Sequence, residues 1–258
     1  MAINASLKGR LRNTSLPKSR ALLPLFEAVV NAIQAVDEAH DDMGSTRIDV
    51  RIVREQQEPL DLGEDHQAFL HAEPIYGFIV SDNGEGFHDK NMESFETLDS
   101  EYRSEYGCRG VGRLLWLKAF TKVEVRSRYL DTQGIMQERN FVFTADSGVS
   151  QHSARTSLGS ERGAEVRLLS FSEHYRRSAP KNTFPIAKTI LEHCLWYFVR
   201  PGGAPNIAII DESERLDLNS LFNEYMLTSS QAQEIVVKDY QFDLVHLRLK
   251  AASRPTHS

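Results

Sequence analysis

The sequence predicts an α+β protein, a two-layer sandwich in which a mixed, mainly antiparallel sheet carries helices on one face. Its elements follow in the order helix, strand, strand, helix, and then several strands with little sequence between them. A doubly wound parallel sheet would instead need a long crossover, usually a helix, between successive strands. The 258 residues, of which 41% are hydrophobic, suffice for one large domain and the start of another.

The first elements are a long helix and two strands. Residues 22–40 place apolar side chains at helical spacing, and Pro24 lies in the first turn, where proline is tolerated. Residues 47–54 alternate between apolar and charged side chains, which predicts a half-buried strand. Residues 55–74 are acidic and polar and predict a loop, and residues 75–81 form an apolar second strand.

The middle of the chain predicts two more helices and a series of strands. The helices are expected at 91–98 and from about 110 through 120, with a polar stretch at 99–108 between them. Strands are expected at about 121–130, 137–145 and 163–171, followed by a helix at about 184–199.

A linker divides the chain near residue 200. The stretch Pro201-Gly-Gly-Ala-Pro205 combines the two residue types that most often interrupt regular structure. We therefore expect one domain over 1–200 and the start of a following domain over 201–258. That second domain would hold strands at 206–211 and 242–250 and would be cut short by the end of the chain.

Composition limits the classes of partner. The net charge of −6 and the pI near 5.9 argue against a general nucleic-acid binder. The absence of a signal peptide and of any long apolar run predicts a cytoplasmic protein without a membrane partner. The first twenty residues are nevertheless basic, as a solvated arm or a local basic patch would be, with Lys8, Arg10, Arg12, Lys18 and Arg20.

Glycines in Gly107-Cys-Arg-Gly110-Val-Gly112 form the first motif that indicates a ligand. The chain has no G-x-x-x-x-G-K-[ST] P-loop, and the glycine order is not the G-x-G-x-x-G of dinucleotide sites. These glycines can let a loop pass close to an anion as it enters a helix, whose N-terminus favours phosphate. Arg109 and Arg113 add positive charge, although a plain capping turn is the alternative.

The second motif is a polar pair within the first helix. Glu27 and Asn31 are four residues apart, so they share one face of the helix within an otherwise apolar run. An amide oxygen such as that of Asn31 is a suitable ligand for Mg²⁺. Glu27 could accept a proton from a water molecule that attacks a terminal phosphate. A solvated pair of side chains is the alternative.

The third motif ends the second strand. In Ser81-Asp-Asn-Gly84-Glu-Gly86, the carboxylate of Asp82 could accept a hydrogen bond from an exocyclic amino group such as that of adenine. Gly84 and Gly86 lack side chains where a flat ring would lie against the backbone. An ordinary turn explains the same residues, because Asp, Asn and Gly are all common in turns.

In combination, FEAVVNAIQA, SDNGEGF and GCRGVGRLLWLKAF resemble the N, G1 and G2 boxes of the Bergerat-fold ATP-binding proteins. This superfamily, also called GHKL, includes gyrase B subunits, the ninety-kilodalton heat-shock chaperones, MutL proteins and sensor histidine kinases. The resemblance covers roughly residues 20–170 and implies a Bergerat fold with an ATP lid at about 88–112.

The resemblance also implies roles for individual residues. Glu27 would be the general base, Asn31 the ligand of Mg²⁺, and Asp82 the partner of the adenine amino group. A glycine–threonine pair in the family opens a late strand, but Gly163-Ala164 stands here, so one adenine contact is in doubt. The remaining nucleotide-binding positions are those of the pocket floor and the phosphate loop: Gly84, Gly86, Gly107, Arg109, Gly110, Val111 and Gly112.

Three activities remain open within this resemblance. The expected one is slow, Mg²⁺-dependent ATP hydrolysis that drives a nucleotide-dependent homodimer, with a protein or DNA client that the sequence does not identify. No histidine precedes the Glu27 helix, which disfavours a histidine kinase, although a partner could supply the acceptor. An ATP-binding interaction module with negligible turnover is the third, because Ala164 replaces threonine and no phosphate-contacting lysine can be named.

Overall fold

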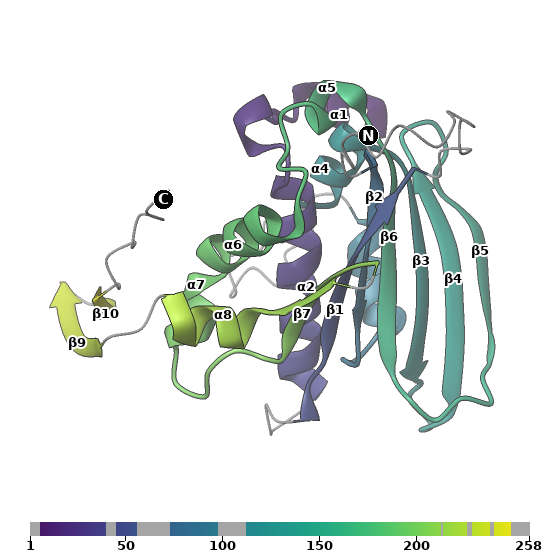
Figure 1. Cartoon of the computed structure of the whole chain (residues 1–258). Coiled ribbons are helices and arrows are strands. Elements are labelled where there is room, and N and C mark those ends of the chain that lie inside the picture. The colour runs from purple at the N-terminus through teal and green to yellow at the C-terminus, as the bar shows by residue number, and fades with distance from the viewer. Residues whose placement is uncertain are drawn as a thin grey trace, which may run out of the picture.

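The computed structural model describes residues 6–39, 45–55, 73–97, 112–212, 214–225, 229–237 and 240–248. Its main feature is an eight-stranded sheet in the order β5-β4-β3-β6-β2-β1-β7-β8 (Figure 1). Only the pair β1–β7 is parallel, and every other neighbouring pair in this sheet is antiparallel. The predicted mixed, mainly antiparallel sheet is therefore confirmed, together with the α+β class.

The strands of this sheet are β1 (Ile48–Arg54), β2 (Ile75–Asp82), β3 (Phe120–Leu130), β4 (Met136–Thr144), β5 (Gly148–Thr156), β6 (Gly163–Phe171), β7 (Ile207–Asp211) and β8 (Glu214–Asp217). A separate antiparallel pair is formed by β9 (Ser229–Val237) and β10 (Tyr240–Arg248).

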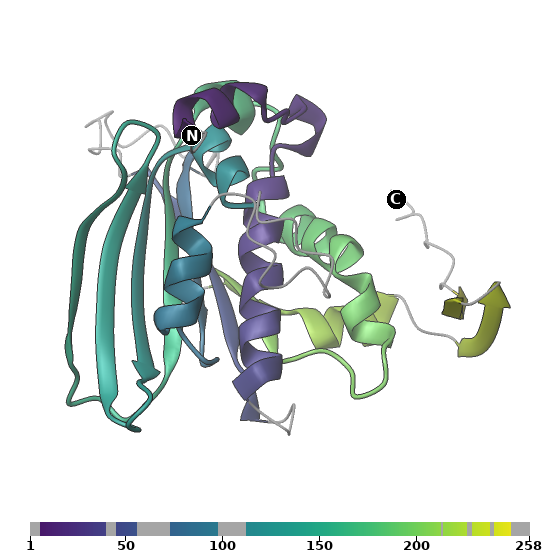
Figure 2. The same ribbon diagram turned by 180° about the vertical axis from the view of Figure 1, so that it is seen from behind.

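Helices α2, α3 and α4 lie against one face of the sheet, which makes the arrangement compatible with two layers (Figure 2). The helices are α1 (Leu7–Asn13), the 3-10 helix η1 (Lys18–Arg20), α2 (Leu23–Ala39), α3 (Asp89–Glu96), α4 (Gly112–Ala119), α5 (Glu173–Arg176), α6 (Thr183–His193), α7 (Leu195–Val199) and α8 (Leu218–Tyr225). In the described part of the chain, no helix has both the length and the apolar character needed to cross a membrane.

Helix α2 is the centre of the helical layer. Its side chains at Leu25, Val29, Ile33 and Val36 are fully buried and recur at helical spacing, so they form one continuous apolar stripe. This stripe packs on β1, β2 and β6. Burial of each such side chain stabilises the fold by roughly 1.5–3 kcal/mol as an upper estimate.

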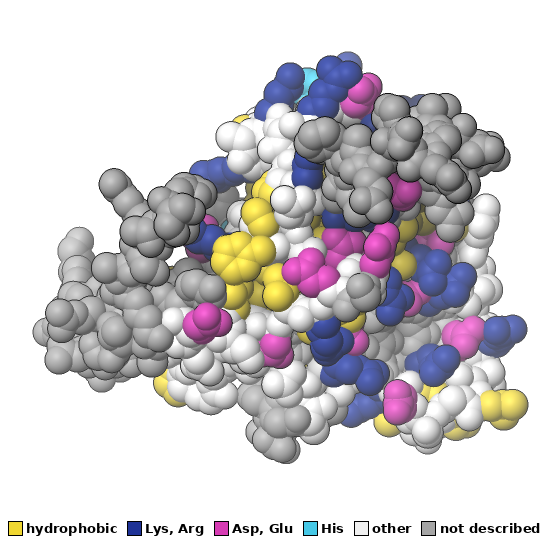
Figure 3. Space-filling model, viewed as in Figure 1, with side chains coloured by type: hydrophobic (Ala, Val, Ile, Leu, Met, Phe, Trp, Pro, Cys, Tyr) yellow, Lys and Arg dark blue, Asp and Glu magenta, His cyan; other side chains and the backbone are white. Residues whose placement is uncertain are grey.

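The two faces of the sheet differ because strand side chains alternate. Along β3, Val123 and Val125 are buried under the helices, whereas Arg126 and Arg128 on the other face are exposed. That second face carries interspersed basic and acidic side chains (Figure 3). We call it the open face, since none of α2, α3 and α4 covers it.

Several elements differ from the sequence predictions. The helix expected at 91–98 begins at Asp89, where the ring of His88 accepts a weak capping hydrogen bond from the backbone N–H of Asn91. The helix expected at 184–199 is interrupted at Cys194, which separates α6 from α7. Two short helices, α1 and α5, and the strand β5 were not predicted, because helices of at most two turns are too short to establish a periodicity and β5 has no apolar alternation.

The strand that follows the predicted linker joins the main sheet. Ile48, Val50 and the rest of the first half of β1 pair in parallel with β7. The sheet therefore extends past Pro201, while the domain boundary at 200/201 stays a prediction.

Candidate functional site

The polar pair on α2 stands out within the helical layer. Glu27 and Asn31 are both half-buried, and no hydrogen bond or ion pair is found for either side chain within the described residues. Burial raises the pKa of Glu27 above its ordinary value, because removal from water disfavours the charged carboxylate. Both side chains are partly open to solvent, so water or a ligand can satisfy their polar atoms.

The N-terminus of α4 lies directly against Glu27. A Cβ atom added at Gly112 would be 2.3 Å from Oε2 of Glu27, closer than any real contact allows. Glycine at position 112 therefore allows this close approach without displacing the side chain of Glu27. The arrangement puts the Glu27 carboxylate beside a helix start, where backbone N–H groups and the helix dipole favour negative charge.

Asp82 is oriented by backbone amides at the end of β2. Its Oδ1 accepts hydrogen bonds from the backbone N–H of Gly84 at 2.9 Å and of Ala164 at 3.3 Å. Asp82 and Ala164 are register partners in the β2–β6 pair, which fixes the second of these contacts. The carboxylate is thus held in one direction at the edge of the sheet, because two donors determine the position of one oxygen.

The glycines after Asp82 are required by packing within the chain itself. A Cβ at Gly84 would lie 2.5 Å from the carbonyl carbon of Ala35, so this turn rests directly on the α2 backbone. The backbone N–H of Glu85 bonds the carbonyl oxygen of Ala35 at 3.0 Å. Gly86 has a φ of 77°, and a Cβ there would lie 2.4 Å from the carbonyl oxygen of Arg128. These contacts explain both glycines without a ligand.

The three motifs therefore meet along one helix. The turn after β2 touches α2 at Ala35, and the start of α4 touches it at Glu27. These two residues are eight positions apart, which is about 12 Å along a helix axis. Asn31 is midway between them on the same face.

Residues that sequence reasoning missed hold the Gly86 turn in place. The buried Oγ of Ser127 accepts from the backbone N–H of Phe87 at 2.7 Å and donates to the carbonyl of Gly163 at 3.0 Å. The side-chain amide of Asn91 donates to the carbonyl of Gly86 at 2.8 Å. Ser127 could have been noticed, since it interrupts the apolar alternation on the buried face of β3.

Two buried arginines hold the ends of α3. At its N-terminus, Arg139 donates to the carbonyl of Phe87 at 2.7 Å and to Asp89 at 2.6 Å. At its C-terminus, Arg113 donates to the carbonyls of Ser94 at 3.2 Å and Thr97 at 2.6 Å. Arg113 follows Gly112 directly, so it joins the end of α3 to the helix start beside Glu27. Its role is thus structural in this arrangement, whereas the sequence suggested charge for an anion.

The remaining predicted residues of the phosphate loop, Gly107, Arg109, Gly110 and Val111, lie outside the described residues. Among the residues that are described, no group of three or more His, Cys, Asp or Glu side chains could hold a metal ion. A magnesium site built on Asn31 does not need such a group, because Mg²⁺ keeps several waters and binds substrate phosphates.

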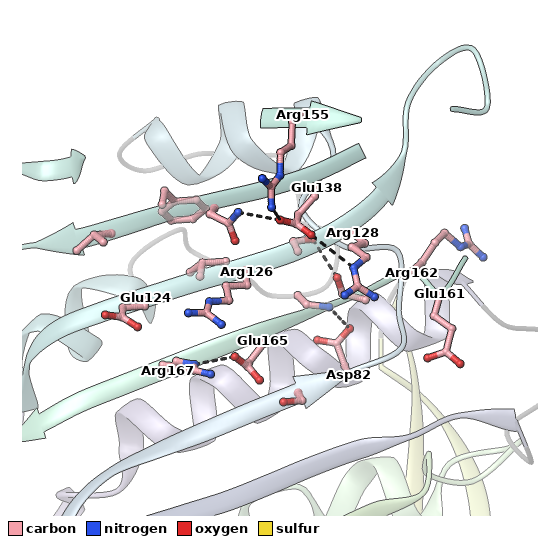
Figure 4. A pocket seen from close by; sticks show the side chains of 18 of the residues that line it. Asp82, Glu124, Arg126, Arg128, Glu138, Arg155, Glu161, Arg162, Glu165 and Arg167 are labelled. Atoms are coloured by element: carbon pink, nitrogen blue, oxygen red, sulfur yellow. Dashed lines mark hydrogen bonds and ion pairs between the residues drawn. The ribbon is translucent and has the colours of Figure 1, made fainter. Parts of the chain in front are cut away.

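A polar groove of about 720 Å³ lies on the open face (Figure 4). Two of its carboxylates are paired with neighbouring guanidinium groups, Glu165 with Arg167 at 2.6 Å and Glu138 with Arg155 at 2.8 Å. Asp82 and Ala164 at the end of β2 and the start of β6 also line this groove. Much of the charge in the groove is therefore compensated by ion pairs. The polar pair Glu27 and Asn31 on α2 is the stronger candidate site, because neither side chain has such a partner among the described residues.

Comparison with known proteins adds no identification to this geometry. A search against models of protein families finds no match for the chain, and a search of curated proteins finds none either.

Proposed function

We propose that the chain binds ATP in a Mg²⁺-dependent manner and hydrolyses it slowly, within a Bergerat-type fold. The observation that carries the proposal is the polar face of α2 that holds Glu27 and Asn31. It brings the Asp82 turn, Asn31, Glu27 and the start of α4 into one line, and it leaves the polar groups of Glu27 and Asn31 without partners among the described residues.

The adenine end of the proposed site is the Asp82 turn. The carboxylate is already oriented by the amides of Gly84 and Ala164, so an amino group can be recognised without further ordering of the side chain. Ala164 supplies a backbone donor but no hydroxyl, and if nothing replaces the missing contact, binding would be weaker by about 1 kcal/mol.

The phosphate end is the start of α4 beside Glu27. The raised pKa makes Glu27 a better proton acceptor than an ordinary carboxylate, provided that it is ionised at the working pH. In that state Glu27 orients a water molecule and accepts its proton. Asn31 would hold the magnesium ion, which supplies charge neutralisation for the transferred phosphoryl group.

The test compares nucleotide binding with phosphate release. Titration calorimetry with Mg²⁺–ATP should show binding to the wild type and to Glu27→Ala, whereas steady phosphate release should be lost in the variant. Removal of a general base typically costs 10²- to 10⁴-fold in rate. Bound ATP with equally negligible release in both proteins would instead identify an interaction module without turnover.

The adenine contact is tested separately by Asp82→Asn. The amide presents an N–H group or a weaker acceptor to the adenine amino group, so the affinity for ATP should fall by about tenfold or more, or 1.4 kcal/mol. GTP, which lacks that amino group, serves as the control ligand. An unchanged ATP affinity in a folded variant would exclude Asp82 from the site.

Hydrolysis of this kind is proposed to drive a nucleotide-dependent homodimer. Light scattering of the protein with and without a non-hydrolysable ATP analogue tests this step. A monomer in both states would separate the hydrolytic site from any dimerisation cycle.

A further inference from the structure

We propose that the N-terminal basic segment and α5 together form a surface that binds the phosphate backbone of nucleic acid. We call this surface the basic cap, and it goes beyond the proposed ATP site. Its cations are Lys8, Arg10, Arg12, Lys18, Arg20, Arg176 and Arg177.

The N-terminal part of the cap is unusually free of acidic residues. The first Asp or Glu of the chain is Glu27, so every charged side chain before it is basic, although the whole chain carries a net charge of −6. The average composition therefore conceals a strong local excess of positive charge. Such a segment has the charge that a polyanion requires.

The structure shows that this segment is docked and not a loose arm. Ser6 caps α1, and Leu7 and Leu11 pack against the hydrophobic core. Leu16 is buried, which anchors the chain between α1 and η1. The cations of α1 and η1 are therefore presented by ordered backbone, and a partner that binds them pays less ordering entropy.

Helix α5 adds its charges at the same end of the molecule. It lies at the same end of the molecule as α1 in both ribbon views (Figures 1 and 2), and dark blue side chains gather at that end in Figure 3. Both arginines at α5 are paired, Arg176 with Glu55 and Arg177 with Glu173, and Lys8 pairs with Asp146. The uncompensated charge of the cap therefore comes from the N-terminal segment. No ion pair is found within the described residues for Arg12, Lys18 or Arg20, all of which are exposed.

The cap suits nucleic acid better than a membrane surface. A helix that lies in a bilayer needs an exposed apolar face, but the leucines of α1 point into the core. The large exposed apolar side chains of the described residues lie outside α1, η1 and α5; they are Tyr76, Leu130, Ile135, Leu158, Phe184 and Trp196. Charge without an apolar anchor is the pattern of backbone-phosphate contacts, which carry no base specificity.

Fluorescence anisotropy of a labelled 30-base-pair duplex, titrated with the whole chain, tests the proposal. We expect sequence-independent binding with a Kd on the order of 10 µM at physiological salt, typical of non-specific contacts. The logarithm of the binding constant should fall against the logarithm of salt concentration with a slope of about −3, since three unpaired cations release counterions.

The test variant is R12E/K18E/R20E, which should bind the duplex at least about tenfold more weakly with a flatter salt dependence. The control is R51E/R126E/K188E, which makes the same change in net charge at exposed cations outside the cap and should bind within about twofold of wild type. If either protein unfolds, judged by circular dichroism, the milder R12Q/K18Q pair is measured against R51Q/R126Q.

Two results would overturn the proposal. Equal losses of affinity in cap and control variants would show that only net charge matters. Binding to phosphatidylserine vesicles without binding to the duplex would identify a membrane surface instead. ATP is omitted from every titration, so the outcome does not depend on the proposed hydrolysis.

Discussion

The Cα of Gly112 faces the carboxylate of Glu27 so closely that no side chain fits between them. This contact joins the start of α4 to the polar pair Glu27 and Asn31 on α2. It determines what a substitution of Gly112 would do. The atom that blocks a new Cβ is the end of a flexible side chain, so the fold can tolerate alanine by moving Glu27.

Gly112→Ala should therefore lower ATP turnover more than it lowers stability. Displacement of a catalytic group by about 1 Å costs roughly 10- to 100-fold in rate. Steady-state phosphate release and thermal melting measure the two effects. Gly9→Ala in α1 is the matched control, because its Cβ would make an ordinary 3.7 Å contact with Ser6. Turnover that survives in Gly112→Ala would argue against Glu27 as the base.

Glu27→Gln should stabilise the protein at neutral pH and not at acid pH. The folded-state pKa of Glu27 is raised, so the wild type is most favoured below the unfolded value near 4.5 and loses stability as pH rises through the folded pKa. A glutamine side chain does not titrate, so in the variant residue 27 adds no pH dependence to the stability. The difference in melting temperature between variant and wild type should grow from pH 4 to pH 7.5. A difference that is constant with pH would mean that the carboxylate is not desolvated.

Gly84→Ala should unfold the protein more easily, in contrast to Gly112→Ala. Its new Cβ would meet backbone atoms of Ala35 and Val36, which cannot rotate away. Overpacking of this kind costs about 1–3 kcal/mol, and a forced backbone shift costs more. Urea denaturation followed by circular dichroism gives the free energy of unfolding. An unchanged midpoint would show that the turn does not rest on α2.

Asp211→Ala should be strongly destabilising, because it leaves the guanidinium of Arg54 buried without its counter-ion. Asp211 also accepts from the hydroxyl of Thr183 at 3.1 Å, so the carboxylate joins β1, β7 and α6. Loss of one partner of a buried pair costs about 3–5 kcal/mol. The double variant Arg54→Met with Asp211→Leu should recover much of this loss, as measured by chemical denaturation.

Cys194 should resist alkylation in the folded protein. Burial raises the pKa of its thiol to about 12, and the thiolate is the reactive form. Iodoacetamide at pH 8, followed by mass spectrometry of the Cys194 peptide, should show modification only after addition of denaturant. Labelling at the same rate with and without denaturant would mean that α6 opens readily at its end.

The sequence predicted the parts of the fold that follow strong periodicity. The stripe of α2 and the alternation of β1 and β3 are visible in the residue order, because burial on one face requires them. The strand β5 was missed since most of its side chains are exposed at the sheet edge. The contacts of Gly84 with Ala35 and of Ser127 with Phe87 were also missed, because they join segments whose approach depends on the whole fold.

The parallel pairing of β1 with β7 has a consequence for synthesis of the chain. Thr46 and Asn206, which are bonded where the two strands begin, lie 160 positions apart in the sequence. While the chain emerges from the ribosome, one edge of β1 stays without a hydrogen-bonded neighbour until β7 has been made, and unpaired strand edges can pair with other chains. Expressed fragments that end before Ile207 would keep this edge of β1 unpaired, so they should accumulate as aggregates.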